Sequence, residues 1–261
     1  MATFVTLDSV FNNQPMSVNL PKDFLYGFSQ ISDGTMSFKF GSTKLVRQNR
    51  QNFCQKLGID IKNCATSQLE HKDKIIRLTN NDLGRNMLTP DYDLTADALV
   101  TSQPGLYLFT VVADCLVIIL VDPQNKSLGL IHAGWQGLNL NIIPKTAAYL
   151  QNNLNSQPKN LLAIISPAIQ TCCYAYESVK QSADKTWQPF LNKQADGLIH
   201  IDLINLAKQQ LTKAGIKLNN IIANSACTAH NHNYYSHFRD QQQNQPDKGR
   251  FTVVAGFKYF I

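Results

Sequence analysis

The sequence lacks any long apolar run. No stretch of about 18 consecutive apolar residues occurs in its 261 residues, which excludes a membrane-spanning helix. The opening residues, MATFVTLDSVFNNQPMSV, show no basic segment followed by an apolar one, so we expect no secretory signal. Both absences favour a cytoplasmic globular protein, either an enzyme or a binding module.

Cysteine is scarce, and so are clusters of basic charge. Six cysteines are too few for a disulfide scaffold, and in a reducing compartment their thiols stay free for metal binding or catalysis. The 24 Lys and Arg residues exceed the 18 Asp and Glu residues, but they are scattered and form no basic run. The composition therefore predicts a mildly basic surface, suited to anionic substrates and without a nucleic-acid partner.

No glycine-rich phosphate fingerprint follows any predicted strand, which argues against a dinucleotide-binding fold. Runs rich in Val, Ile, Leu and aromatic residues predict strands at 106–112, 116–121, 127–132, 161–165, 220–223 and 251–257. Amphipathic patterns predict helices at 45–57, ended by Gly58, and at 202–214, capped by Asp202 and ended by Gly215. Strands and helices do not alternate strictly, so we expect an α+β fold. It would be a layered single domain over residues 1–261, with mixed β-sheets flanked by helices and an exposed loop at 240–248.

The stretch ADCLVIILVDPQNKSLGLIHAGW predicts a β-hairpin. Asp122 followed by Pro123 is typical of a type I turn. A turn centred between Pro123 and Gln124 pairs residues whose numbers sum to 247, which places Cys115 opposite His132. Opposed residues share a face and have Cβ atoms about 4.5–5.5 Å apart, a suitable separation for two ligands of one metal.

Thiolate and neutral imidazole are ligands that zinc accepts, as does copper. A third ligand is needed, and His71 lies in QLEHKDKI, between two short strand-like runs, where a turn would present it. Two other interpretations stay open. In the first, Cys115 and His132 are ordinary core residues. In the second, they form a catalytic dyad without a metal.

These residues resemble a known family. The motifs QLEHKD (68–73), DALVT (97–101), ADC (113–115), HAGW (132–135), SPAIQTCCY (166–174), ACT (226–228) and KGR (248–250) resemble those of the YfiH-like laccase-domain family. Its members have been called multicopper polyphenol oxidoreductases, purine nucleoside phosphorylases and peptidoglycan editing factors. The resemblance covers nearly the whole chain. It implies a layered α+β fold with mixed sheets, and zinc bound by His71, Cys115 and His132.

The resemblance also implies an activity, purine nucleoside phosphorolysis. Adenosine, inosine and S-methyl-5'-thioadenosine are the expected substrates, with phosphate as the second reactant and adenosine deamination as a further activity. Three protein ligands leave a fourth position on zinc for water, phosphate or a substrate oxygen. Cys115 and Asp114 are the catalytic candidates, and the candidates for substrate binding are Arg50, Cys173, Arg239 and Arg250.

Several positions depart from the family pattern around these motifs. The departures are Leu69 and Glu70 before His71, Lys72 in place of Gly after it, Gln136 in place of Arg, Ser166 and Gln170 in place of two Gly residues, and Ala175 in place of Glu. The residues that the resemblance implies as metal ligands are retained, so the departures bear on substrate choice and on the level of activity.

Other functions share the same residues. A copper-dependent polyphenol oxidase is disfavoured because a multicopper cluster consumes many histidines and the chain has six, although copper binding in vitro is expected. Hydrolytic editing of peptidoglycan precursors would use a metal-bound water or Cys115. A non-enzymatic binding module is the remaining alternative.

The adjacent Cys172 and Cys173 need a separate interpretation. We expect one to be a buried thiol and the other to line the site, and a disulfide between neighbours would be strained. Cys227 is expected near the metal but is not counted as a ligand.

Overall fold

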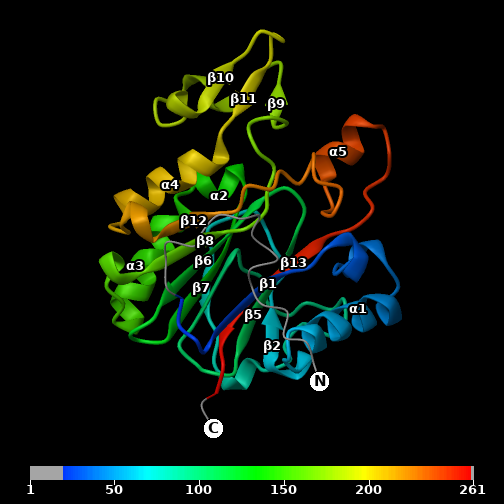
Figure 1. The fold of residues 1–261 in the computed structure, drawn as a ribbon, viewed down its shortest axis with the longest axis vertical. Helices are drawn as coiled ribbons and strands as arrows, with labels where there is room; N and C mark the ends of the chain where they lie inside the picture. The colour runs from blue at the N-terminus through cyan, green and yellow to red at the C-terminus, as the bar shows by residue number, and fades with distance from the viewer. Residues whose placement is uncertain (1–19, 260–261) are drawn as a thin grey trace.

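Two β-sheets packed face to face form the centre of the molecule in a computed structural model that describes residues 20–259 (Figure 1). The first sheet has the strand order β1 (Phe24–Phe28), β13 (Phe251–Phe257), β5 (Tyr107–Val112), β2 (Cys64–Thr66). The second sheet has the order β12 (Ile221–Ala223), β8 (Leu162–Ile165), β6 (Leu116–Asp122), β7 (Ser127–Ala133), β4 (Ala98–Thr101), β3 (Ile75–Arg77). Both sheets mix parallel and antiparallel pairs.

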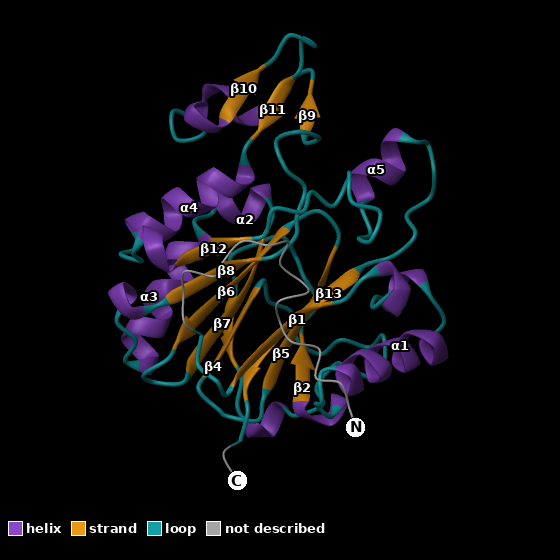
Figure 2. Ribbon diagram, in the orientation of Figure 1, coloured by secondary structure: helices purple, strands orange, loops and turns teal. Residues whose placement is uncertain are grey.

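Helices cover the outer faces of both sheets (Figure 2). The six-stranded sheet packs against α2 (Trp135–Asn139), α3 (Ile142–Leu154) and α4 (Leu203–Lys213), and the four-stranded sheet packs against α1 (Thr43–Lys56). The sequence of β6 is a continuous apolar run because both faces of this strand are buried. Val117, Ile119 and Val121 face the other sheet, while Leu116 and Ile118 face the helices.

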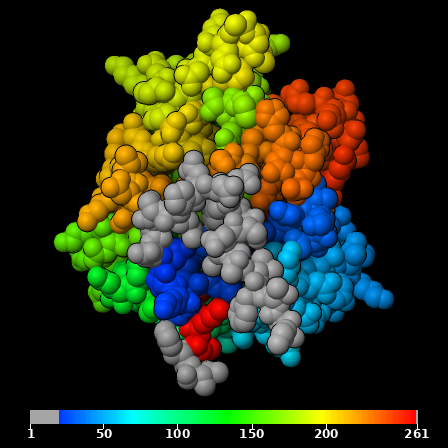
Figure 3. Space-filling model, viewed as in Figure 1, coloured from blue at the N-terminus to red at the C-terminus, as the bar shows by residue number. Residues whose placement is uncertain are grey.

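A smaller sheet stands away from these layers. It has the order β10 (Leu191–Lys193), β11 (Ile199–Ile201), β9 (Ala175–Tyr176) and follows β8 in the chain. The short helix α5 (His237–Gln242) forms a second protrusion beside it. Figure 3 shows the two protrusions in yellow and orange, at the top and upper right of the molecule. Within residues 20–259, no helix combines the length and apolar character that a membrane crossing requires.

The expected α+β fold class and the predicted elements are confirmed, with one exception. Both predicted helices and all six predicted strands are present within one or two residues of the expected bounds, and Asp202 caps α4 by accepting a hydrogen bond from the Asn205 amide. The loop predicted at 240–248 is wrong at its start, because α5 extends to Gln242. Ser236 caps that helix, and the Asp240 carboxylate is buried beneath it. The domain bounds of 1–261 stay a prediction, since residues 1–19 and 260–261 lie outside the described part.

The predicted register of the central hairpin is wrong by two residues. The structure pairs His132 with Val117, so paired residue numbers sum to 249 and the turn is centred after Gln124. Asp122 itself pairs with Ser127, and its carboxylate accepts hydrogen bonds from the amides of Gln124 and Asn125. A shift of two keeps every side chain on its original face. Cys115 therefore remains on the face of His132, but it lies diagonally across from it, just before β6.

Candidate metal centre

Three side chains from distant segments meet at one end of the six-stranded sheet. Their ligand atoms, from His71, Cys115 and His132, all lie within 4.8 Å of one another. The two imidazole rings meet edge to face with centroids 4.8 Å apart. His71 is exposed, Cys115 half-buried and His132 buried, so the cluster opens to the surface on the His71 side. The structure thus brings together the three residues expected as ligands, and their binding of a metal stays a prediction.

Gly134 makes room for the sulfur of Cys115. A Cβ atom placed on Gly134 would lie 2.9 Å from Cys115 Sγ and 3.8 Å from His132 Nε2. The φ angle of Gly134 is −67°, which any residue adopts, so the backbone conformation does not require glycine here. The side-chain space does require it, and this accounts for the glycine of HAGW.

We expect Gly134→Ala to lower metal content without unfolding the protein. The added methyl group displaces the Cys115 sulfur while the backbone at residue 134 accepts alanine unchanged. Elemental analysis and a thermal melt of the same preparation measure both effects. Gln136→Ala, an exposed change two residues further on in α2, is the matched control and should keep its metal. Full metal content in Gly134→Ala would contradict this geometry.

Asp97 organises two of the three side chains. Its carboxylate is buried and accepts a hydrogen bond of 2.9 Å from His132 Nδ1. It also accepts hydrogen bonds from the backbone amides of Glu70, His71 and Lys72, at 3.2, 2.9 and 2.9 Å. These bonds hold the loop on which His71 adopts a left-handed conformation, with φ of 59°. A carboxylate that fixes the second nitrogen of a histidine is a typical partner of a metal-binding imidazole.

The electrostatics of the cluster favour an ionised thiol. Burial raises the pKa of Cys115, but His132 and His71 outweigh that effect and lower the pKa to about 6. Burial lowers the pKa of His132, while the Cys115 thiolate and the Asp97 carboxylate raise it to about 9. In the metal-free protein, Cys115 is therefore a thiolate and His132 an imidazolium between these two values.

The ionisation of Cys115 predicts a pH-dependent reaction. In metal-free protein, alkylation of Cys115 by iodoacetamide should rise with pH through a midpoint near 6, because the thiolate is the reactive form. Burial and the neighbouring Cys227 raise the pKa of Cys172, so that exposed thiol should react mainly at higher pH and serves as an internal control. Peptide mapping by mass spectrometry measures both. A Cys115 midpoint at or above 8 would contradict the thiolate.

The donor set of the cluster fits zinc. One thiolate and two imidazoles are zinc ligands, the Asp97 carboxylate supports one imidazole from behind, and three protein ligands leave one position open. The same contacts also suit the metal-free dyad, because the His132 imidazole lies against the Cys115 thiol.

Asp114 is buried and positions its neighbour Cys115. One carboxylate oxygen accepts a 2.6 Å hydrogen bond from Thr228 Oγ1, and the other accepts a 2.7 Å bond from the Phe238 amide at the start of α5. Its backbone is left-handed, with φ of 77°. A direct catalytic role for Asp114 stays a prediction.

Two of the arginines expected to bind substrate are engaged within the fold. Arg50 is fully buried in α1, where it donates hydrogen bonds to the carbonyls of Met36, Asn86 and Met87. Arg250 donates to Asp247, and its guanidinium lies 4.4 Å from the Phe40 ring centroid. Substrate binding by either residue stays a prediction.

The other two candidates, Cys173 and Arg239, line one pocket. It has a volume of about 280 Å³ and lies between the segment leading to β9 and helix α5. The remaining lining residues are Ala175, Leu198, Ala229, Phe238, Gln242 and Gln243. Arg239 forms part of the wall, and its guanidinium donates to the carbonyls of Thr228 and Tyr234.

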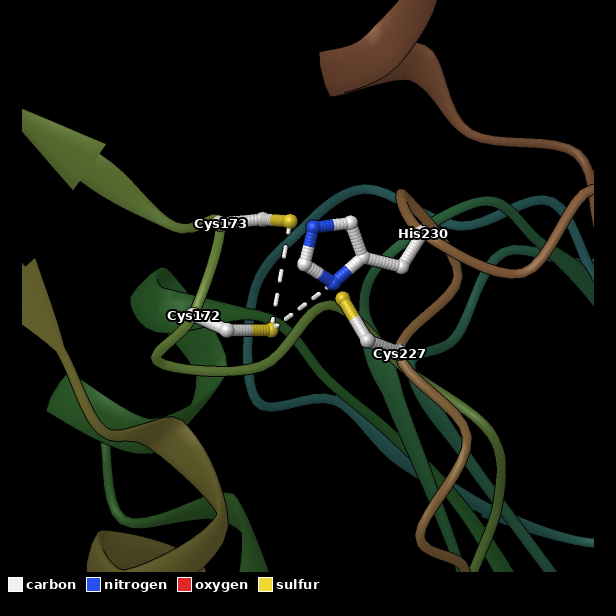
Figure 4. Close-up of side chains that lie close together, drawn as sticks. All are labelled: Cys172, Cys173, Cys227 and His230. Carbon is white, nitrogen blue, oxygen red and sulfur yellow. Dashed lines mark hydrogen bonds between the residues drawn. The ribbon is translucent and has the colours of Figure 1, made fainter.

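A second cluster of metal-ligating residues lies beside this pocket. Ligand atoms of Cys172, Cys173, Cys227 and His230 all lie within 4.8 Å of one another (Figure 4). The expectation of one buried thiol among Cys172 and Cys173 is wrong, because Cys172 is exposed and Cys173 half-buried, while Cys227 is the buried one. The adjacent cysteines and the spacing of Cys227 and His230 were visible in the sequence, but nothing there indicated that the two segments meet.

Comparisons with known proteins agree on one family. A family model described as "Multi-copper polyphenol oxidoreductase laccase" matches residues 32–258. A purine nucleoside phosphorylase of Xylella fastidiosa is 28% identical over 234 residues, which span 87% of this chain and 85% of the relative. Purine nucleoside phosphorylase YlmD of Bacillus subtilis is 24% identical over 257 residues, spanning 91% and 90%.

Solved structures show the same fold. The structure of YlmD from Geobacillus stearothermophilus matches with a TM-score of 0.83 at 24% identity, covering 91% of this chain and 93% of that chain. The structure of YfiH from Bacillus licheniformis matches with a TM-score of 0.79 at 26% identity, covering 90% and 93%. The α+β arrangement of layered mixed sheets is therefore shared with both.

Proposed function

The chain belongs to the multi-copper polyphenol oxidoreductase laccase family, and we propose that it acts as a zinc-dependent purine nucleoside phosphorylase. The observation that carries the proposal is the cluster of His71, Cys115 and His132, backed by Asp97 and open on one side. Relatives that align over most of this chain are named purine nucleoside phosphorylases. The proposed substrates are adenosine, inosine and S-methyl-5'-thioadenosine with phosphate, and adenosine deamination is a secondary activity.

The nucleoside would enter beside an aromatic cluster. The rings of Tyr174, Tyr176 and Phe238 contact one another, with centroids 5.4 to 6.0 Å apart, and Phe238 lines the 280 Å³ pocket. Flat rings beside an open pocket suit the stacking of a purine base. In phosphorolysis, a phosphate oxygen bonds to the anomeric carbon of the ribose, and the bond from that carbon to the purine nitrogen breaks. The purine leaves with a proton.

The residues of the chain hold the reacting groups rather than supply redox chemistry. When bound, zinc supplies a Lewis acid that attracts a substrate oxygen or phosphate. Asp97 keeps the Nδ1 proton of His132 in place, so Nε2 is directed toward Cys115. Asp114 holds Cys115 at the start of β6 through its bonds to Thr228 and Phe238. Lys72 lies beside His71 in an exposed ion pair with Glu70, and its ammonium group is available to phosphate.

A substrate panel tests the proposal. Purified protein with measured zinc content would be incubated with each of the three nucleosides, with and without phosphate, and base and ribose 1-phosphate measured. We expect base release that depends on phosphate. Conversion of adenosine to inosine in the same assay measures deamination. Zinc-loaded protein that releases no base from any of the three would overturn the phosphorylase proposal.

Copper-dependent phenol oxidation is the second candidate, favoured by the description of the family model. Imidazole and thiolate bind Cu²⁺ more tightly than Zn²⁺, so added copper should enter the cluster in vitro. Only six histidines are present in the chain, too few for a multicopper cluster. Protein purified without added copper should show negligible phenol oxidation, and several coppers per chain with strong oxidation would promote this candidate.

Release of a peptide or amino acid from peptidoglycan precursors would instead support an editing hydrolase.

A further inference from the structure

We propose that Cys172, Cys173, Cys227 and His230 form a second metal site, which binds a structural zinc ion. The site is separate from the cluster of His71, Cys115 and His132, with which it shares no residue. It offers three sulfur atoms and one imidazole nitrogen. A tetrahedral set of soft sulfur ligands with one nitrogen is typical of zinc.

Two distances between the ligand atoms match those of a tetrahedral zinc site, and all four ligand atoms lie within 4.8 Å of one another. Bonds of about 2.3 Å to sulfur and 2.0–2.1 Å to nitrogen give tetrahedral edges of about 3.8 Å between sulfurs and 3.6 Å between sulfur and nitrogen. The Sγ atoms of Cys172 and Cys173 are 3.9 Å apart, and Cys172 Sγ lies 3.4 Å from His230 Nδ1. In Figure 4, all four side chains point toward one common centre.

Two tight turns supply the ligands in pairs. Cys172 and Cys173 lie on a turn in which the Cys173 amide donates to the Gln170 carbonyl. Cys227 and His230 lie on a second turn, closed by a 2.8 Å hydrogen bond from the Asn231 amide to the Cys227 carbonyl. A bridge between Ala168 and Cys227 holds the two segments side by side. The ligands are therefore placed by backbone hydrogen bonds, which do not depend on a metal.

One further contact suits a metal-bound thiolate. The backbone amide of Gln170 donates a 3.4 Å hydrogen bond to the sulfur of Cys227. Hydrogen bonds of this kind orient the ligands of metal sites and stabilise the charge on sulfur. Cys227 is buried, so its thiolate would otherwise lack solvation.

A disulfide explains the four residues less well. Neighbouring Cα atoms are about 3.8 Å apart, shorter than the roughly 4.4–6.8 Å that disulfides require. A bond between Cys172 and Cys173 would also leave Cys227 and His230 without a role. A zinc ion uses all four.

The number of ligands distinguishes the two sites. Four protein ligands close the coordination sphere, which is the property of structural zinc sites, whereas three ligands leave a position for a reactant. The second site joins the segment before β9 to the segment before α5. Cys173 and Ala229 on these segments line the 280 Å³ pocket, so the zinc ion would fix two of its walls relative to each other.

Metal stoichiometry tests this inference. Protein purified under reducing conditions and dialysed against Zn²⁺, then against metal-free buffer, should retain two zinc ions per chain. The double variant Cys172→Ser, His230→Ala should retain one, because both residues are exposed and their replacement leaves the core intact. Cys115→Ser should also lose one, from the other site. His232→Ala, an exposed histidine two residues further on, is the matched control and should keep two.

A spectroscopic measurement identifies which site is filled. Cobalt bound to three thiolates gives stronger sulfur-to-metal charge-transfer absorption than cobalt bound to one. We expect most of this absorption to disappear in the Cys172→Ser, His230→Ala variant and to persist in Cys115→Ser. The inference is overturned if the wild-type chain binds one zinc or none and the double variant binds as much as the wild type. Loss of zinc only in Cys115→Ser would sink the second site and leave the proposed function standing.

Discussion

Cys115→Ser is expected to lower the rate of phosphorolysis by more than about 100-fold. Removal of a residue that only supports a metal ligand typically costs 10–100-fold in metal affinity or activity, and removal of a ligand itself should cost more. Serine keeps the size of the side chain but cannot replace the thiolate, whose pKa of about 6 ionises it at neutral pH. Base release from adenosine, measured with zinc content on the same sample, gives the result.

The control for this change is another free thiol. Cys54 lies in α1, buried with its sulfur 3.7 Å from that of Cys64, away from the three-residue cluster. Cys54→Ala should lower the free energy of unfolding while the activity of the folded protein is unchanged. If Cys115→Ser keeps near-normal rates, the hairpin is structural and the phosphorylase site lies elsewhere.

Asp97→Asn is expected to weaken zinc binding by about 10–100-fold and to destabilise the fold as well. The asparagine amide cannot accept the hydrogen bonds that both carboxylate oxygens now accept. Each buried donor left without a partner costs about 1–3 kcal/mol, and the amides of Glu70, His71 and Lys72 compete for the remaining oxygen. Zinc affinity by competition with a chelator, and unfolding with urea, measure the two effects.

Asp73→Asn provides the matched control for Asp97. This carboxylate lies on the same loop but pairs with Lys145 at the surface. An exposed ion pair of this kind contributes little, so zinc affinity should not change. Equal effects of the two substitutions would show that general loop charge, rather than the carboxylate behind His132, controls binding.

Periodicity predicted the elements that capping residues and apolar runs mark locally, but it missed the 13-residue helix α3. The helix at 45–57 and the strand at 251–257 are close to α1 and β13, because capping residues and apolar runs mark them locally. Short elements such as β3 and β9 were missed. Strands of two or three residues carry no periodic signal, and their pairing partners determine them.

For the cluster of His71, Cys115 and His132, the sequence indicated which residues come together, but it did not give the correct hairpin register. The pairing of Cys115 with His132 on one face followed from the hairpin, although the register was wrong. The Asp122 side chain caps the turn and moves its centre by one residue, an effect that a general turn rule does not include. Because the resulting shift is even, the error did not separate Cys115 from His132.

Contacts between distant segments were beyond the reach of sequence patterns. Asp97 was named only as part of the DALVT motif, and its four hydrogen bonds became visible only once β4, β7 and the His71 loop were placed together. The meeting of Cys172 with His230 depends likewise on the parallel pairing of β8 with β12. The sequence also did not show that Arg50 donates hydrogen bonds to backbone carbonyls, and substrate binding by this residue stays a prediction.

The hydrogen bonds on Asp114 have a consequence for the order of folding. Thr228 and Phe238 follow Asp114 by 114 and 124 residues along the chain. Contacts so distant in sequence form only after long loops have closed. The residue before Cys115 therefore reaches its final conformation late, and a chain leaving the ribosome completes this end of the sheet only after Thr228 and Phe238 have emerged. Under the proposed function, zinc would bind at Cys115 after folding and would not nucleate it.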